Sequence, residues 1–192
     1  PSLVDINGTT ASFVLNYRVS AVNQAGVSDI YNIEEFYRLR YTDTRVFLLD
    51  FTRRTQETFR PDQGVLETAG INLGISNTDV EFKFDEKKKT VAFVQENELW
   101  EYRINGGKLT RIFGFPQQEN MDYRDFYDQN NIKVLRVEES GNILFAVSGY
   151  MNRGKREGEN GIGFYSYEEA SATVEEILFV QTMESYDMLK LD

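Results

Sequence analysis

The sequence predicts an all-β chain built from antiparallel four-stranded meanders. Apolar and polar residues alternate with a period of two along most of the chain, as they do in strands with one buried face. Short polar turns separate these segments, and Asn105-Gly106-Gly107 is typical of hairpins because such residues adopt a positive φ at low cost. The same layout of segments and turns returns roughly 50 residues later, which indicates an internal repeat.

Residues 1–79 are expected to form an N-terminal β-rich segment. It is either a degenerate copy of the repeated four-stranded meander, called a blade below, or a cap on the copies that follow. Residues 45–51 (RVFLLDF) are nearly all apolar, as expected of a strand buried on both faces. The segments 20–34, 61–79 and 116–131 are rich in Gly, Asn, Gln and Asp and are interpreted as connectors. The strands expected in this part are residues 11–19, 35–41, 45–51 and 56–60.

Residues 32–41 allow two interpretations. The alternation of EFYRLRY in residues 35–41 favours a strand. The order Asn32-Ile33-Glu34-Glu35 also resembles a helix capping box, and Ile33, Phe36 and Tyr37 would share one helical face. A short helix near 32–41 therefore remains an alternative to a strand.

Residues 80–131 are expected to form one blade-like meander plus a connector, and residues 132–192 a second meander plus a tail. Phe93 aligns with Phe145 and Tyr102 with Tyr165, and the growing offset places an insertion between the second and third strands of the later copy. We expect all parts to form one compact domain. Because the sequence begins without an initiator methionine, we interpret it as a piece excised from a longer chain or as a processed mature chain. The strands expected here are residues 80–84, 90–95, 98–104, 108–113, 132–138, 143–148, 161–167 and 173–180.

A four-stranded meander that repeats at this interval is typical of β-propeller blades. Residues 80–115 and 132–180 resemble the loosely conserved blades of bacterial periplasmic and peptidase-associated propellers, and VEESGNILFAVSGYMNRG resembles segments of large Firmicutes surface or membrane proteins. The resemblance implies two to three blades and a bacterial extracellular or cell-surface location, and no particular function. The absence of cysteine suits both the bacterial exterior and the cytosol, so a cytoplasmic location is the alternative. Fewer than four blades do not close a ring, so the chain is expected to be either part of a larger propeller or a stack of small sheets with the N-terminal third as a cap. In the first case an exposed blade face would allow copies to associate.

The composition excludes several classes of function. The formal net charge of −10 argues against nucleic-acid binding and against anionic membrane surfaces, since both need a basic face. The chain has no Cys and no His, which excludes disulfides, thiol nucleophiles, Cys/His zinc sites and Ser-His-Asp triads. No apolar run reaches the roughly 20 residues of a membrane-spanning helix.

Two loops, 116–131 and 149–161, carry the candidate ligand-binding residues. Loop aromatic residues offer rigid area for stacking on sugars or peptides, and the basic residues of 149–161 would suit an anionic ligand. Residues 149–155 match GxxxxGK, but Arg156 follows where a phosphate loop needs Ser or Thr, so the segment is interpreted as a flexible loop or a binding loop. The candidates are Tyr123, Phe126, Tyr127, Tyr150, Arg153, Lys155 and Arg156.

Three acidic residues of one connector, Asp122, Asp125 and Asp128, have the oxygen ligands that Ca²⁺ prefers. Their spacing lacks the Asp-x-Asp-x-Asp-Gly order of an EF-hand, so a polar loop is the main interpretation and Ca²⁺ the alternative. We expect no other cofactor.

The sequence favours a non-catalytic binding or structural module of a larger, extracellular bacterial protein. Its expected partners are the rest of its own chain, another protein or a glycan, contacted through the two loops. The alternative is a glycan-active hydrolase that uses Asp and Glu gathered at one end of the sheets. That alternative predicts two carboxylates facing a cleft, one of them with a raised pKa.

Overall fold

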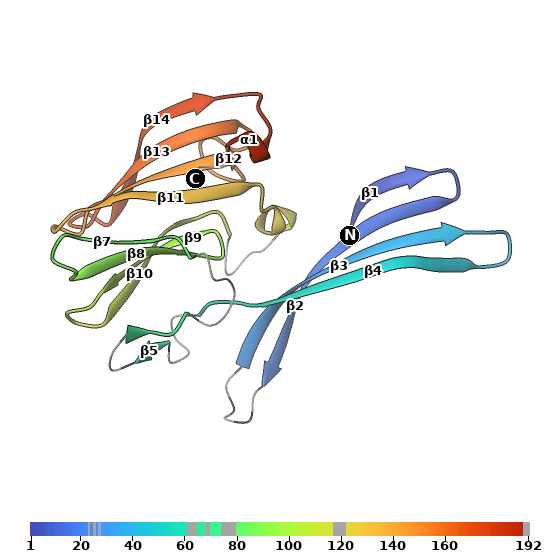
Figure 1. Ribbon diagram of the computed structural model, residues 1–192, viewed down its shortest axis with the longest axis horizontal. Coiled ribbons are helices and arrows are strands. Elements are labelled where there is room, and N and C mark those ends of the chain that lie inside the picture. Colours follow the sequence, from blue (N-terminus) through green and yellow to red (C-terminus); the bar gives the residue numbers. More distant parts are fainter. Residues whose placement is uncertain are drawn as a thin grey trace. The chain divides into compact units, whose positions relative to one another are not determined.

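The computed structural model describes residues 1–22, 24, 26, 28–60, 65–67, 70–73, 80–116 and 122–189. Within these ranges the chain is all-β: it has three antiparallel four-stranded sheets, a two-stranded ribbon and two single helical turns (Figure 1). The predicted fold class is confirmed, and each four-stranded sheet is a meander of the blade-like kind. The chain divides into two compact units, Pro1–Gln63 and Gly64–Asp192.

The first unit is a single sheet of long strands in the order β1-β2-β3-β4 (Figure 1). A turn at Gly8-Thr9 joins the first two strands, and Gly8 has the positive φ of 55° that this tight turn requires. The sequence did not predict β1 or this hairpin. The strands are β1 (Ser2–Asn7), β2 (Thr10–Val22), β3 (Ser28–Tyr41) and β4 (Val46–Glu57).

Residues 32–41 form a strand, so the helical alternative is wrong. They belong to β3, which pairs with β2 from Val22↔Ser28 to Thr10↔Arg40 and with β4 on its other side. Pairing on both sides satisfies the backbone along the whole strand, which a single helical turn starting from a local capping pattern cannot match.

Three further expectations for the first unit are also wrong. Much of the supposed connector 20–34 belongs to β2 and β3, and residues 56–60 contain no separate strand because 56 and 57 end β4. The segment 45–51 is not buried on both faces. From residue 46 it runs in β4, an edge strand that is exposed at every position except Phe47, which is half-buried.

Three aromatic side chains lie together on one face of the first sheet. Phe13, Tyr37 and Phe51 lie opposite one another on neighbouring strands and share one face. The rings of Phe13 and Tyr37 are stacked with their centres 5.2 Å apart, and Tyr37 and Phe51 are 5.0 Å apart in a tilted arrangement. Cross-strand aromatic pairs of this kind stabilise a sheet and help to fix its register.

A buried carboxylate, Glu35, lies on that same face with 4% of its surface exposed. Its oxygens accept hydrogen bonds from the Tyr17 hydroxyl (2.9 Å), the Tyr37 hydroxyl (2.8 Å) and Arg53 Nε (2.7 Å). The hydrogen bond from Tyr37 is the largest contribution that holds the pKa of Glu35 below its ordinary value. The charged form of Glu35 therefore ties the three long strands together.

We expect the first unit to lose stability in acid through Glu35. Because the folded pKa is lowered, the contribution of Glu35 is present above the unfolded pKa, about 4.3, and is lost as the pH falls through the lower folded pKa. Urea unfolding between pH 2 and 7, followed by the NMR amide signals of β3, measures this loss. Glu35→Gln should flatten the pH dependence, and the neighbouring, more exposed Glu34→Gln should leave it intact. Equal profiles for both variants would contradict the assignment.

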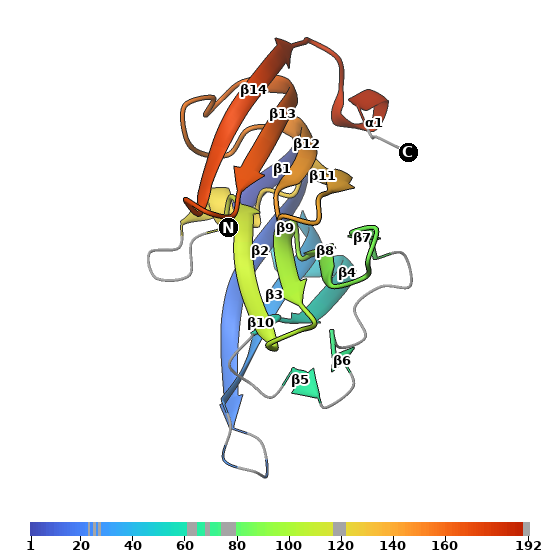
Figure 2. The ribbon, with the colours of Figure 1, turned by 90° about the vertical axis from the view of Figure 1, so that its left-hand side faces the viewer.

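The second unit contains two four-stranded sheets, in the orders β10-β9-β8-β7 and β11-β12-β13-β14, and the ribbon of β5 (Leu66–Glu67) and β6 (Gly70–Ile71). All eight strands of the two sheets were predicted with boundaries within two residues. Figure 2 shows β12, β13 and β14 following one another across their sheet in chain order. The strands are β7 (Phe82–Phe84), β8 (Thr90–Gln95), β9 (Glu98–Arg103), β10 (Lys108–Gly114), β11 (Asn130–Val137), β12 (Ile143–Tyr150), β13 (Asn160–Glu168) and β14 (Thr173–Gln181).

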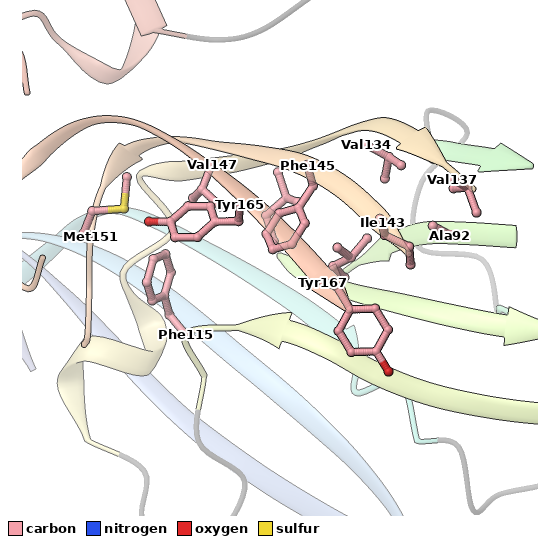
Figure 3. Packing of buried hydrophobic residues seen from close by; sticks show 12 residues of the cluster. Ala92, Phe115, Val134, Val137, Ile143, Phe145, Val147, Met151, Tyr165 and Tyr167 are labelled. Carbon is pink, nitrogen blue, oxygen red and sulfur yellow. The ribbon is translucent and has the colours of Figure 1, made fainter. Parts of the chain in front are cut away.

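The core of the second unit lies between these two sheets (Figure 3). Phe145 in β12 is completely buried and stacks on Tyr165 of β13, with ring centres 5.4 Å apart. Phe113 of the other sheet contacts both rings, at 5.3 Å from Phe145 and 5.5 Å from Tyr165. The other members of the cluster are mainly aliphatic residues of β8, β9, β11 and β12.

The first strands of the two sheets, β7 and β11, lie beside each other and are joined by side chains. Glu81, just before β7, accepts a hydrogen bond from the backbone N–H of Val134 (3.2 Å). Lys83 donates to the carbonyl of Leu135 (3.1 Å). These contacts satisfy backbone groups on the edge of β11 that its neighbour β12 leaves free, so the edge is covered rather than open.

We expect Phe145→Ala to destabilise the second unit by about 3–5 kcal/mol, because it leaves a cavity between the sheets. Urea unfolding followed by the fluorescence of Trp100, the only tryptophan, measures this change. Phe82→Ala is the matched control: Phe82 lies in the same unit with 59% of its surface exposed, and its loss should cost no more than about 0.5 kcal/mol. Similar losses for the two variants would contradict the assigned core.

Candidate functional site

The two loops that the sequence singled out lie together in the second unit. The first loop, 116–131, contains η1 (Tyr123–Phe126), a turn of 3-10 helix that is capped at its start by Asp122. The Asp122 carboxylate accepts a hydrogen bond from the backbone N–H of Arg124 (2.9 Å), and Asp125 accepts one from the backbone N–H of Asp122 (2.6 Å). This reciprocal capping gives the connector a defined shape.

A buried ion pair joins this connector to the β12–β13 loop. Arg153 donates from Nη2 to both oxygens of Asp125, each at 2.9 Å, and lies 3.1 Å from Asp122. The Asp125 side chain has no exposed surface and that of Arg153 only 12%. Asn152, 2% exposed, donates from Nδ2 to the carbonyls of Arg124 (2.9 Å) and Tyr127 (2.7 Å). The two loops therefore form one surface with a fixed geometry.

The acidic residues proposed for Ca²⁺ are mostly engaged with arginines. Arg124 pairs with Asp122 on one side and with Glu157 (2.7 Å) on the other. The hydrogen bond from Arg124 holds the pKa of Asp122 far below its ordinary value. Asp128 is exposed. Among the residues that the structure describes, no three acidic side chains are placed to hold a metal ion together.

The predicted basic cluster is divided among separate partners. Arg156 pairs with Glu176 (2.8 Å) and lies over the ring of Phe179 at 4.6 Å. Lys155 is 80% exposed and 3.9 Å from Glu176. Of the three basic residues, Arg153 and Arg156 hold the loop in place, and Lys155 is the one that extends into solvent.

The loop aromatic residues are brought together in part. Tyr127 and Tyr150 contact each other edge to face, with ring centres 4.8 Å apart, and Tyr127 is 46% exposed. Phe126 is half-buried, and the side chain of Tyr123 lies outside the described residues. Tyr127 and Tyr150, one from each loop, form an aromatic pair at the junction of the loops.

Sequence reasoning missed Asn152 and Glu157, which hold this surface together. Both stand in a polar, glycine-rich segment that is typical of any surface loop, so nothing in the local pattern marks them. Asn152 lies 25 and 28 residues from the carbonyls it binds, and Glu157 lies 33 residues from Arg124. A single sequence carries no sign of such distant pairing.

A second carboxylate cluster lies between the two sheets. Glu101 on β9 is 1% exposed and accepts a hydrogen bond from Arg103 Nε (3.3 Å), and Arg103 also binds Glu169, in the turn between β13 and β14 (2.7 Å). Burial raises the pKa of Glu101. Gly141 passes close above the Arg103 guanidinium, with a positive φ of 93° and no room for a side chain. The Glu101 carboxylate is enclosed between the sheets, which accounts for its raised pKa.

One described pocket, of about 450 Å³, lies between β7 and β11. Lys83, Phe84 and Glu86 line one side, and residues 135–139 line the other. None of the candidate site residues lines this pocket, so the loop surface and the pocket are separate features of the unit.

Comparison with models of known protein families and with curated proteins gave no match. No helix in the described ranges has both the length and the apolar character needed to cross a membrane.

We expect Arg153→Met to destabilise the second unit by about 3 kcal/mol, because it leaves the buried Asp125 carboxylate without its cation. Lys155→Met is the matched control, since it removes the same charge from an exposed position of the same loop and should change stability by less than about 0.5 kcal/mol. Urea unfolding followed by Trp100 fluorescence compares the two. Equal effects would show that the Asp125–Arg153 pair does not hold the loops.

Proposed function

We propose that the second unit is a non-catalytic binding module, and that its contact surface is formed by residues 122–131 and 149–161. The observation that carries this proposal is the buried Asp125–Arg153 ion pair, which joins the two loops. Burying an ion pair is costly and rarely improves stability over an apolar contact. A loop that served only to connect two strands would not need one, whereas a binding loop gains from a fixed shape.

The exposed chemistry of this surface favours a glycan or an extended protein segment as ligand. The Tyr127–Tyr150 pair offers rigid aromatic area, which binds at a low cost in conformational entropy. Lys155 and Asp128 are exposed charges of opposite sign in the two loops and can orient polar groups. The net charge of −10 and the arginines already paired with carboxylates disfavour nucleic acid.

The setting that we propose is a larger bacterial protein at the cell surface, in which this module contacts other parts of the same protein or a second protein. The blade-like sheets support a module within a larger chain, and the absence of cysteine is compatible with both the cell exterior and the cytosol. In this proposal no cofactor takes part in binding, since the carboxylates nearest the surface, Asp122 and Asp125, are neutralised by arginines.

A glycan-active hydrolase is the second candidate, favoured by the raised pKa of Glu101 near a second carboxylate, Glu169. Its chemistry would need the two sheets to separate so that a substrate reaches Glu101. Release of reducing sugar from the glycan panel described below, abolished in Glu101→Gln, would favour this candidate over a binding module.

We expect one soluble glycan or cell-wall fragment to raise the midpoint of thermal unfolding of the intact chain in a saturable way. A ligand present at 100 times its Kd stabilises the folded form by about 2.7 kcal/mol, a shift of several degrees. Tyr127→Ala and Tyr150→Ala should abolish the shift, and Phe82→Ala, which removes an exposed aromatic ring away from the loops, should retain it. A panel of glycans, cell-wall fragments, extended peptides and Ca²⁺ without any shift would contradict the proposal and favour a purely structural module.

A further inference from the structure

The edge strand β4 of the first unit has no partner on its outer side. It is twelve residues long and pairs, within the described residues, only with β3. Its first half is apolar and exposed: Val46 has 57% of its surface accessible, Leu48 59% and Phe51 41%. A long, apolar edge strand with free backbone groups is a ready site for the addition of another strand.

The opposite edge strand of the same sheet, β1, is less suited than β4 to pairing with an added strand. The edge strand β1 has only six residues, and its pairing with β2 is interrupted by a bulge between Leu3 and Asp5. Short strands and bulges are the usual means of blocking edge pairing. β4 also has a register shift with β3, at Leu49, but it is twice as long as β1, contains neither proline nor glycine, and pairs with β3 without interruption from Asp50 to Glu57.

We propose that β4 pairs antiparallel with β4 of a second copy of this chain, so that two first-unit sheets join into one sheet of eight strands. The argument for a second copy is charge complementarity within β4. With the two-fold axis at Thr52, Asp50 of each copy lies opposite Arg54 of the other, and Phe51 lies opposite Arg53. Opposite charges at facing positions of an antiparallel pair stabilise it, and like charges destabilise it.

The net charge of β4 removes the main obstacle to this pairing. The whole chain carries −10, so most surfaces of two copies repel each other. β4 has two acidic residues, Asp50 and Glu57, and two basic residues, Arg53 and Arg54, and is neutral. Among the described residues Arg54 makes one long contact, with Glu34 (3.7 Å), and its side chain is 79% exposed, so it is available to a second strand.

This pairing is distinct from the blade-face association expected from the sequence, since it uses an edge of the first unit. It is also independent of the loop surface of the second unit, so failure of either proposal leaves the other open to its own test.

Sedimentation velocity of the intact chain over a range of concentrations tests the pairing. We expect a reversible dimer, and Asp50→Arg should weaken it about tenfold or more, because it places like charges opposite each other twice in each dimer. Combining Asp50→Arg with Arg54→Asp should restore the dimer. Asp5→Arg on β1 is the matched control, with the same charge change at the other edge, and should leave the dimer unchanged.

A covalent test checks the position of the axis. The chain has no cysteine, so Thr52→Cys gives a single thiol that lies opposite its counterpart across the proposed axis. Mild oxidation should yield a disulfide-linked dimer, and Asn16→Cys within β2 should not. Circular dichroism confirms that each variant folds. A monomer at every concentration, or a dimer equally insensitive to Asp50→Arg and Asp5→Arg and not cross-linked through Thr52→Cys, would overturn the proposal.

Discussion

The face-to-face packing of two four-stranded sheets around Phe145 is the constraint on which the second unit depends. Each sheet is a meander of short strands that would be marginal alone, because a single layer leaves its apolar face in water. Packing the sheets against each other buries Phe145 and Tyr165 completely or nearly so. It also aligns β7 with β11, so that Glu81 and Lys83 reach the backbone of the next sheet. The loops at the ends of the strands inherit their positions from this packing.

The loop surface follows from that packing by a further step. Once β11 and β12 are paired, the segment before β11 and the segment after β12 emerge side by side, because Asn130 faces Gly149 in the register. Polar groups that become buried where the two segments meet need hydrogen-bond partners. The buried carboxylate of Asp125 finds its partner in the guanidinium of Arg153, which carries the opposite charge. The cost of desolvating both ions makes the arrangement dependent on both partners being present, which favours one geometry of the loops over many.

How much the sequence predicts depends on how local the cause is. The strands between residues 80 and 181 were predictable because alternation and turn residues lie within each hairpin. The strand at 32–41 was not, since the same residues satisfy a helical pattern and only pairing with β2 and β4 decides between them. In the candidate site, Asp125 and Arg153 were singled out for separate roles, a metal site and an anion site. They neutralise each other across 28 residues, and no local pattern shows that.

The two units solve the burial problem differently. In the second unit one four-stranded sheet covers the apolar face of the other. The first unit has a single four-stranded sheet, and three of its strands are at least twelve residues long. Its central strand is held by the Glu35 cluster, in which one carboxylate accepts from groups on β2, β3 and β4. That cluster fixes the register of the three strands, and with it the side of β4 on which each residue lies. Side chains alternate along any strand, and the register that Glu35 holds places Phe51 and Arg53 on its own face of the sheet and Asp50 and Arg54 on the other.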